Sequence, residues 1–205
     1  MTDAQWDKIL RIRTTGRDAS RSDQYRYPYE PTPYSVLERL ANSGYITKEN
    51  TFLDYGCGKG RVEFFLYYQC RCRCIGVEYD DRIYDVACEN KGNVMRAGRV
   101  EFVHGKAEEY QVPEKVDRFY FFNPFSVEIL QKVMGRIRES WDGRERLLLF
   151  YYPSDEYVAW LMTLEDLMFV DEIDCKDLFS GDARERILIF EQEYICTPES
   201  MESPI

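Results

Sequence analysis

Three glycines within five positions mark the first candidate site. Residues 52–65, FLDYGCGKGRVEFF, place Gly56, Gly58 and Gly60 between a short apolar run of strand character and a run long enough for a helix. Glycine reaches backbone conformations that other residues avoid, so a ligand can approach such a turn closely. Asp54 ends the expected strand, where its carboxylate can accept a hydrogen bond from a cationic group. The stretch predicts a nucleotide-type cofactor site.

The glycine spacing argues against several common nucleotide loops. The dinucleotide fingerprint GxGxxG and the kinase glycine loop both need a glycine where the chain has Arg61. A phosphate loop needs GxxxxGK[ST], which this turn lacks. Glu78 ends the next expected strand and could chelate ribose hydroxyls, but NAD enzymes use the same device. An NAD-type oxidoreductase stays as an alternative that the missing third glycine disfavours.

An acid followed by GxGxG resembles the first motif of class I S-adenosylmethionine-dependent methyltransferases, and the resemblance spans about residues 30 to 190. It implies that the glycine backbone admits S-adenosyl-L-methionine. Asp54 would then accept from the amino group of this cofactor, and Glu78 would bind its two ribose hydroxyls. Family members often carry an adenine-binding acid after the third strand, where this chain has Lys106. Glu108, or the backbone near Ala107, is the candidate adenine contact.

Two further segments extend the resemblance. Asn123-Pro124-Phe125 looks like a shortened form of the [D/N/S]PP[Y/F] signature of amino-group methyltransferases. This implies that the three residues hold an acceptor nitrogen, although an Asn-Pro turn can also simply end a strand. The stretch YEPTPYSVLERL is similar to that of a subgroup with small lysine methyltransferases. There Thr32 and Tyr34 would contact the cofactor as a lid, or else act as a helix cap and an inward-packed ring.

Strand and helix patterns alternate along the chain, which predicts parallel strands with helices on both faces and ligands at the strands' carboxyl ends. We expect strands at 51–55, 73–78, 99–105, 116–123, 146–152, 167–174 and 186–194, and helices at 33–43, 61–69, 80–92, 127–140 and 155–163. The last two strands can form a hairpin. With the family resemblance, this predicts a three-layer α/β/α sandwich whose seven-stranded sheet is mostly parallel, with the last strand antiparallel.

The length of 205 residues fits one domain. We expect residues 31–195 to form it, after a flexible or loosely docked polar segment at 1–30 and before a frayed tail at 196–205. The net charge of −10 disfavours nucleic acid as a partner and suits a basic peptide or an amine. The methyl acceptor, protein or small molecule, and the oligomeric state stay open.

No apolar run is long enough to span a membrane, and the start of the chain lacks a secretory signal. With seven cysteines, this predicts a reducing, cytoplasmic location. Cys70, Cys72 and Cys74 are spaced unlike structural zinc ligands, so no metal is predicted. His104 is expected to be structural.

Methyl transfer from a sulfonium needs alignment more than a nucleophile or a metal, and alignment contributes roughly 7–11 kcal/mol. The sequence therefore predicts a methyltransferase that acts on a nitrogen acceptor by in-line displacement. The alternative is a non-catalytic S-adenosylmethionine-binding module that serves regulation or assembly.

Overall fold

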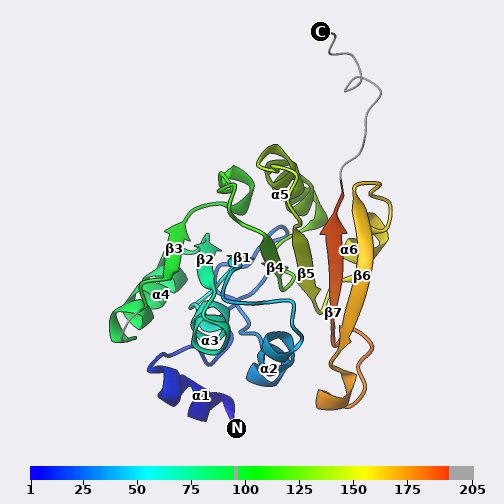
Figure 1. The fold of residues 1–205 in the computed structure, drawn as a ribbon. Helices are drawn as coiled ribbons and strands as arrows, with labels where there is room; N and C mark the ends of the chain where they lie inside the picture. Colours follow the sequence, from blue (N-terminus) through cyan, green and yellow to red (C-terminus); the bar gives the residue numbers. More distant parts are fainter. Residues whose placement is uncertain (95–96, 194–205) are drawn as a thin grey trace, which may run out of the picture.

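The fold is built on one seven-stranded sheet, which a computed structural model describes for residues 1–94 and 97–193 (Figure 1). The strand order is β3-β2-β1-β4-β5-β7-β6. The strands are β1 (Thr51–Tyr55), β2 (Arg73–Glu78), β3 (Val100–His104), β4 (Arg118–Phe121), β5 (Leu147–Tyr151), β6 (Leu167–Asp174) and β7 (Arg186–Gln192). β7 runs antiparallel to both of its neighbours. The predicted mostly parallel sheet with an antiparallel last strand is confirmed.

Helices cover both faces of the sheet, as the alternation predicts (Figure 1). The α-helices are α1 (Asp3–Leu10), α2 (Tyr34–Asn42), α3 (Arg61–Cys70), α4 (Asp81–Asn93), α5 (Val127–Glu139) and α6 (Asp155–Leu161). Two short 3₁₀ turns are η1 (Ala107–Glu109) and η2 (Lys176–Leu178). The first four helices share one apolar cluster with the sheet, and α5 and α6 share the other.

The side chains of β1 alternate between the two faces of the sheet, one beneath α3 and the other beneath α5. Leu53 and Tyr55 belong to the cluster beneath α5, whereas Phe52 belongs to the cluster beneath α3. Because alternate residues of a strand share a face, Asp54 lies on the same side as Phe52. A carboxylate is thereby placed in the buried layer between the sheet and α3, where Asp54 is 3% exposed.

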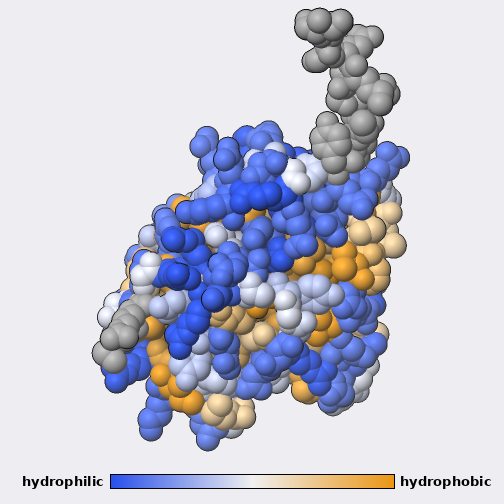
Figure 2. Space-filling model, viewed as in Figure 1, coloured by the Kyte–Doolittle hydropathy of each residue, from blue (hydrophilic) through white to orange (hydrophobic). Residues whose placement is uncertain are grey.

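The sheet ends on one side in the hairpin of β6 and β7. Exposed apolar residues gather on β6, namely Met168, Phe169 and Val170. Apolar colour reaches the surface on this side of the molecule in Figure 2. The pairing register shifts between Phe169 and Asp171, which indicates a bulge in this edge strand. The expected tail at 196–205 lies outside the described residues.

The N-terminal residues differ from the expectation of a loosely docked segment at 1–30. α1 buries Trp6 and Leu10 against the cluster beneath α3, and Trp6 lies edge-on to Phe65 with ring centroids 5.0 Å apart. The indole of Trp6 also donates a hydrogen bond to Glu38 on α2, at 2.9 Å. The mostly polar composition of the segment gives no sign of these contacts, because they depend on partners far along the chain.

The start of α2 also differs from its predicted cap. The N-cap residue is Pro33, and no side chain caps the helix. Thr32 instead shares a hydrogen bond with the Tyr120 hydroxyl, at 3.1 Å. Its hydroxyl thereby tethers the chain before α2 to the middle of the sheet.

We expect Trp6→Ala to lower the free energy of unfolding by about 3–5 kcal/mol, because it removes a buried ring from the core. Ile9→Ala, on the exposed side of the same helix, should change it by less than about 0.5 kcal/mol. Urea unfolding of both variants checks this. Equal, small effects would show that α1 contributes nothing to the core.

Candidate cofactor site

The glycine loop after β1 is closed in by two other segments. A side chain at Gly58, where φ is +58°, would place its Cβ 2.2 Å from the ring of Tyr29. One at Gly56, where φ is +79°, would lie 2.5 Å from Cβ of Pro124. Both the backbone conformation and the space require glycine here. The loop is thus held between the chain after β4 and the residues that precede α2.

Residues 14–32, which precede α2, are called the strap here. The strap lies over the carboxyl ends of β1, β2 and β4. The pocket lies between the strap and the loops of the sheet. Predicted site residues that line it are Thr32, Asp54, Gly56, Glu78, Ala107, Glu108, Pro124 and Phe125. Strap residues that line it include Asp18, Arg21, Arg26, Tyr27, Tyr29 and Glu30. The position agrees with the rule that open α/β sheets bind ligands beyond their carboxyl ends.

Tyr34, predicted as a lid contact, lies away from this pocket. Its ring is 1% exposed, lies 4.4 Å below the guanidinium of Arg61, and its hydroxyl donates to Asp7. Of the two interpretations that the sequence leaves open for Tyr34, the structure matches the inward-packed ring.

Glu78 is already oriented by backbone donors. One carboxylate oxygen accepts from the N–H of Gly58 at 2.9 Å, and the other accepts from the N–H of Asp80 at 2.8 Å. Burial raises the pKa of Glu78, while these two donors act in the opposite direction. Each carboxylate oxygen has a second lone pair, so the group could still accept from a pair of ribose hydroxyls.

The predicted adenine side of the pocket contains an ion pair that the sequence does not suggest. The guanidinium of Arg26, from the strap, lies 4.3 Å from the centre of the Tyr79 ring and donates to Glu108 at 2.8 Å. Lys106 pairs instead with Glu109, at 2.7 Å. Glu108 lines the pocket, but its carboxylate already has a partner there.

Asn123 connects the loop after β4 to the loop after β5. Its amide nitrogen donates to the Tyr152 carbonyl, and its amide oxygen accepts from the N–H of Ser154 at 3.1 Å. The carbonyl of Pro124 accepts from the N–H of Tyr27 in the strap at 3.3 Å. The side chain of Asn123 therefore positions the loop, and it does not line the pocket.

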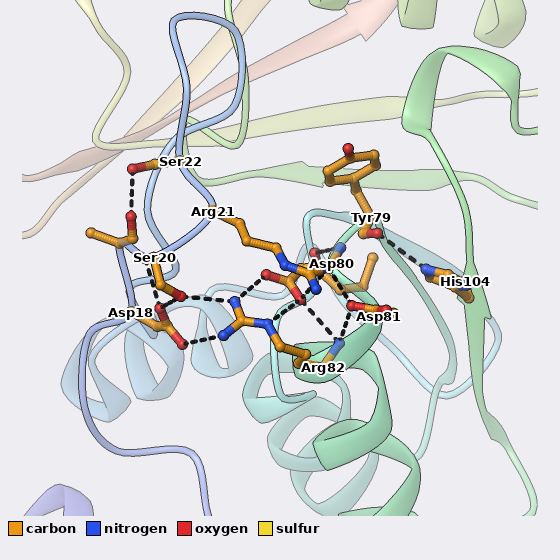
Figure 3. Close-up of polar contacts among 11 residues, drawn as sticks. Asp18, Ser20, Arg21, Ser22, Tyr79, Asp80, Asp81, Arg82 and His104 are labelled. Atoms are coloured by element: carbon orange, nitrogen blue, oxygen red, sulfur yellow. Dashed lines mark hydrogen bonds and ion pairs between the residues drawn. The ribbon is translucent and has the colours of Figure 1, made fainter.

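Hydrogen bonds and ion pairs connect the strap to the start of α4 (Figure 3). Arg82 donates to Ser20 at 2.8 Å and pairs with Asp80 at 2.7 Å. Arg21 pairs with Asp81. Sequence reasoning missed the strap as a wall of the site. The tyrosine-rich stretch YRYPYE at 25–30, unusual in a polar segment, is the signal that could have found it.

The cysteine cluster and His104 do not line the pocket. Sγ of Cys72 and Sγ of Cys74 are 3.5 Å apart in the core, and both cysteines are free. The ring of His104 is hydrogen-bonded to the Tyr79 carbonyl at 3.1 Å. Within residues 1–94 and 97–193, no group of three or more His, Cys, Asp or Glu side chains could hold a metal ion.

The methyltransferase domain family matches residues 52–140, from β1 to just past α5. A Saccharolobus islandicus protein-lysine N-methyltransferase is 28% identical over 88 residues, 42% of this chain and 55% of the relative. A Dictyostelium discoideum histone-lysine N-methyltransferase, H3 lysine-79 specific, is 41% identical over 58 residues, 28% of this chain and 3% of the relative. The chain thus spans about half of one relative and a small fraction of the other.

Solved structures share the fold at low identity. A Salinibacter ruber RNA methyltransferase in complex with S-adenosyl-L-homocysteine has a TM-score of 0.58 and 20% identity, covering 82% of this chain and 97% of its own. A putative Escherichia coli methyltransferase has a TM-score of 0.64 and 15% identity, covering 87% and 99%. The family match covers less than half of the chain, and these solved structures show the fold that the chain shares with them. Among the described residues, no helix is long and apolar enough to cross a membrane.

We expect Gly58→Ala to displace Tyr29 and strain the loop, at a cost of at least about 1–2 kcal/mol from the backbone conformation alone. The affinity for S-adenosylhomocysteine should fall with it. Gly92→Ala is the control, because Gly92 lies within α4 and an added Cβ meets nothing within 4 Å. Thermal unfolding and calorimetry compare the two; an unchanged Gly58→Ala protein would contradict the tight loop.

Proposed function

We propose that this chain is a class I S-adenosylmethionine-dependent methyltransferase, and that it transfers a methyl group to a nitrogen acceptor, a protein side chain or a small amine, by in-line displacement. The observation that carries the proposal is the position of the loop after β4. Pro124 and Phe125 line the pocket, and Pro124 lies against Gly56 of the cofactor loop. An acceptor beside this loop would therefore be next to the cofactor, where alignment is the main requirement of the reaction.

Several of the predicted residues then have a role. Asp54 binds the amino group of the cofactor, and Glu78 binds its ribose. The backbone of the glycine loop admits the methionine part of the cofactor. Pro124 offers a carbonyl to an acceptor N–H, once the strap N–H of Tyr27 gives up that bond, and Phe125 packs on the acceptor. Asn123 is a positioning residue that keeps this loop in place.

The charges near the loop favour an acceptor that arrives as a cation. Tyr27 lies over the loop within the electrostatic influence of Glu156 and Glu128, which, after burial, raise the pKa of its hydroxyl. The net charge of −10 acts in the same direction at longer range. The Saccharolobus relative, by its name, methylates protein lysine. A lysine or amine acceptor would pass its proton to water before the nitrogen attacks.

The alternative function is a cofactor-binding module without catalysis, because the pocket residues would serve such a module equally well. Methyl-labelled cofactor incubated with a cell extract separates the two. Label in a protein side chain or a small amine supports the proposal. Label on oxygen or carbon would overturn the nitrogen acceptor, and cofactor binding without transfer to any component would favour the module.

Asp54→Asn should weaken the binding of S-adenosylmethionine by about ten- to a hundred-fold, since a charge-assisted hydrogen bond contributes about 1.5–3 kcal/mol. Asp85→Asn, an exposed change on α4, is the matched control and should bind as the parent does. Calorimetry gives both dissociation constants. Equal affinities for the two variants would remove Asp54 from the site.

Asn123→Ala should leave the affinity for the cofactor within a few-fold and lower turnover by about a hundred-fold, because the loop that it holds shifts against the acceptor. Asn42→Ala removes a comparable side-chain bond to a carbonyl on α2, far from the loop. Single-turnover rates with labelled cofactor measure the effect. If cofactor affinity and turnover fall together in Asn123→Ala, Asn123 shapes the cofactor site and not the acceptor site.

A further inference from the structure

Tyr157 is a buried tyrosine of α6 whose hydroxyl reaches the loop after β4. Its side chain is 1% exposed, and its hydroxyl donates to the carbonyl of Phe125 at 2.5 Å. A buried tyrosine hydroxyl usually finds a hydrogen-bond partner, and here the partner is a backbone atom of the loop that we propose receives the acceptor. Phenylalanine would fill the same space, so the packing of α6 does not by itself require this hydroxyl.

The strap does not make this bond, because it contacts other backbone groups of the loop. Arg26 and Phe125 form an isolated antiparallel bridge. The flanking residues make its hydrogen bonds: the N–H of Tyr27 donates to the Pro124 carbonyl at 3.3 Å, and the N–H of Ser126 donates to a strap carbonyl at 2.8 Å. The two opposed residues of such a pair are not hydrogen-bonded to each other, so the carbonyl of Phe125 points away from the strap.

The position of Tyr157 is itself fixed at its backbone and at its ring. Its N–H donates to the side chain of Ser154, the N-cap of α6, at 3.2 Å. Its ring packs edge-on against Phe150 of β5, with ring centroids 6.2 Å apart. The N–H of Ser154 in turn donates to the amide oxygen of Asn123. The start of α6 and the loop after β4 therefore hold each other through bonds in which the strap has no part.

We propose that Tyr157 is a positioning residue for the methyl acceptor: its hydroxyl keeps the loop after β4 in place when the strap releases the Pro124 carbonyl. The inference rests on the proposed function, in which an acceptor N–H takes the bond that Tyr27 makes in this structure. That exchange removes a strap contact from the loop. The bond from Tyr157 to Phe125 points away from the strap and stays intact, so the Pro124 carbonyl keeps its place beside the cofactor loop.

Tyr55 provides a matched control in the same apolar cluster as Tyr157. Its side chain is 0% exposed, and among the residues that the structure describes its hydroxyl has no hydrogen-bond partner. Tyr55→Phe and Tyr157→Phe thus remove the same atom from two equally buried rings, and only the second change removes a bond to the loop. A difference between the two variants reports that bond.

The test is the transfer of labelled methyl from S-adenosylmethionine to a cell extract at saturating cofactor, beside calorimetry of S-adenosylhomocysteine binding. Tyr157→Phe should bind S-adenosylhomocysteine within about two-fold of the unchanged protein. It should transfer label about ten- to a hundred-fold more slowly, because a small misplacement of the loop lowers turnover by such factors. Tyr55→Phe should match the unchanged protein in both measurements.

Replacement of Tyr157 by para-aminophenylalanine, which keeps a donor at this place, should restore most of the transfer. A role in stability alone would lower the melting temperature of Tyr157→Phe and leave the transfer rate of the folded protein as it is. That result, or an equal loss of transfer in Tyr55→Phe, overturns the inference and leaves the proposed function intact. A parallel loss of S-adenosylhomocysteine affinity in Tyr157→Phe also overturns it, because the hydroxyl would then shape the cofactor site. An unchanged protein that transfers no label overturns the proposed function and the inference together.

If Tyr157→Phe does not fold, amide hydrogen exchange in the unchanged protein decides. The N–H of Tyr27 donates from the strap to the loop, whereas the N–H of Ser154 donates to Asn123 from the start of α6. If the strap opens while the loop stays in place, the N–H of Ser154 should be protected at least about tenfold more than that of Tyr27. Equal protection would show that strap and loop open together, and it would overturn the inference.

Discussion

The buried guanidinium of Arg61 joins the glycine loop to the chain that covers it, and the pocket depends on this junction. Its Nε donates to the Thr14 hydroxyl at 2.7 Å, and Nη1 donates to the Thr32 carbonyl at 3.2 Å. These two residues are the ends of the strap, so one side chain fixes both. Arginine suits this position because its planar group offers several donors in fixed directions. The side chain directly after the last glycine of the loop thus determines where the covering wall of the pocket lies.

Beneath that wall, the site concentrates acids where a cationic ligand would enter. Asp54 and Glu78 come from the ends of adjacent strands, and Glu63 comes from the helix that follows the loop. The strap brings Arg26 to Glu108, so an ion pair balances the charge at the predicted adenine side of the pocket. In the proposed orientation, the amino group of the cofactor meets the acids at the other end of the pocket.

The parts of this structure that local pattern determines could be predicted from the sequence. β1, β2 and β6 have the predicted bounds, because each is a short run bounded by turn residues. The glycine spacing predicted the tight loop after β1 for the same reason. Long-range contacts escaped prediction. Thr32 satisfies its hydroxyl with Tyr120, far along the chain, and Asn123 turns its amide to the loop after β5. Glu63 stands in the sequence as one polar residue in an apolar helix, and only the packed sheet shows that its carboxyl group lies against Gly76 of β2.

The contact between Glu63 and Gly76 also restricts how this family of sequences can diverge. A Cβ at position 76 would lie 2.5 Å from Oε1 of Glu63 and 2.6 Å from Cβ of Cys57, so a side chain on β2 would displace both residues. Relatives that keep the acid and the cysteine should keep the glycine, and relatives with alanine or serine on β2 should differ at both of the other positions. Covariation among these three positions would record the history of the buried acid across the lineage.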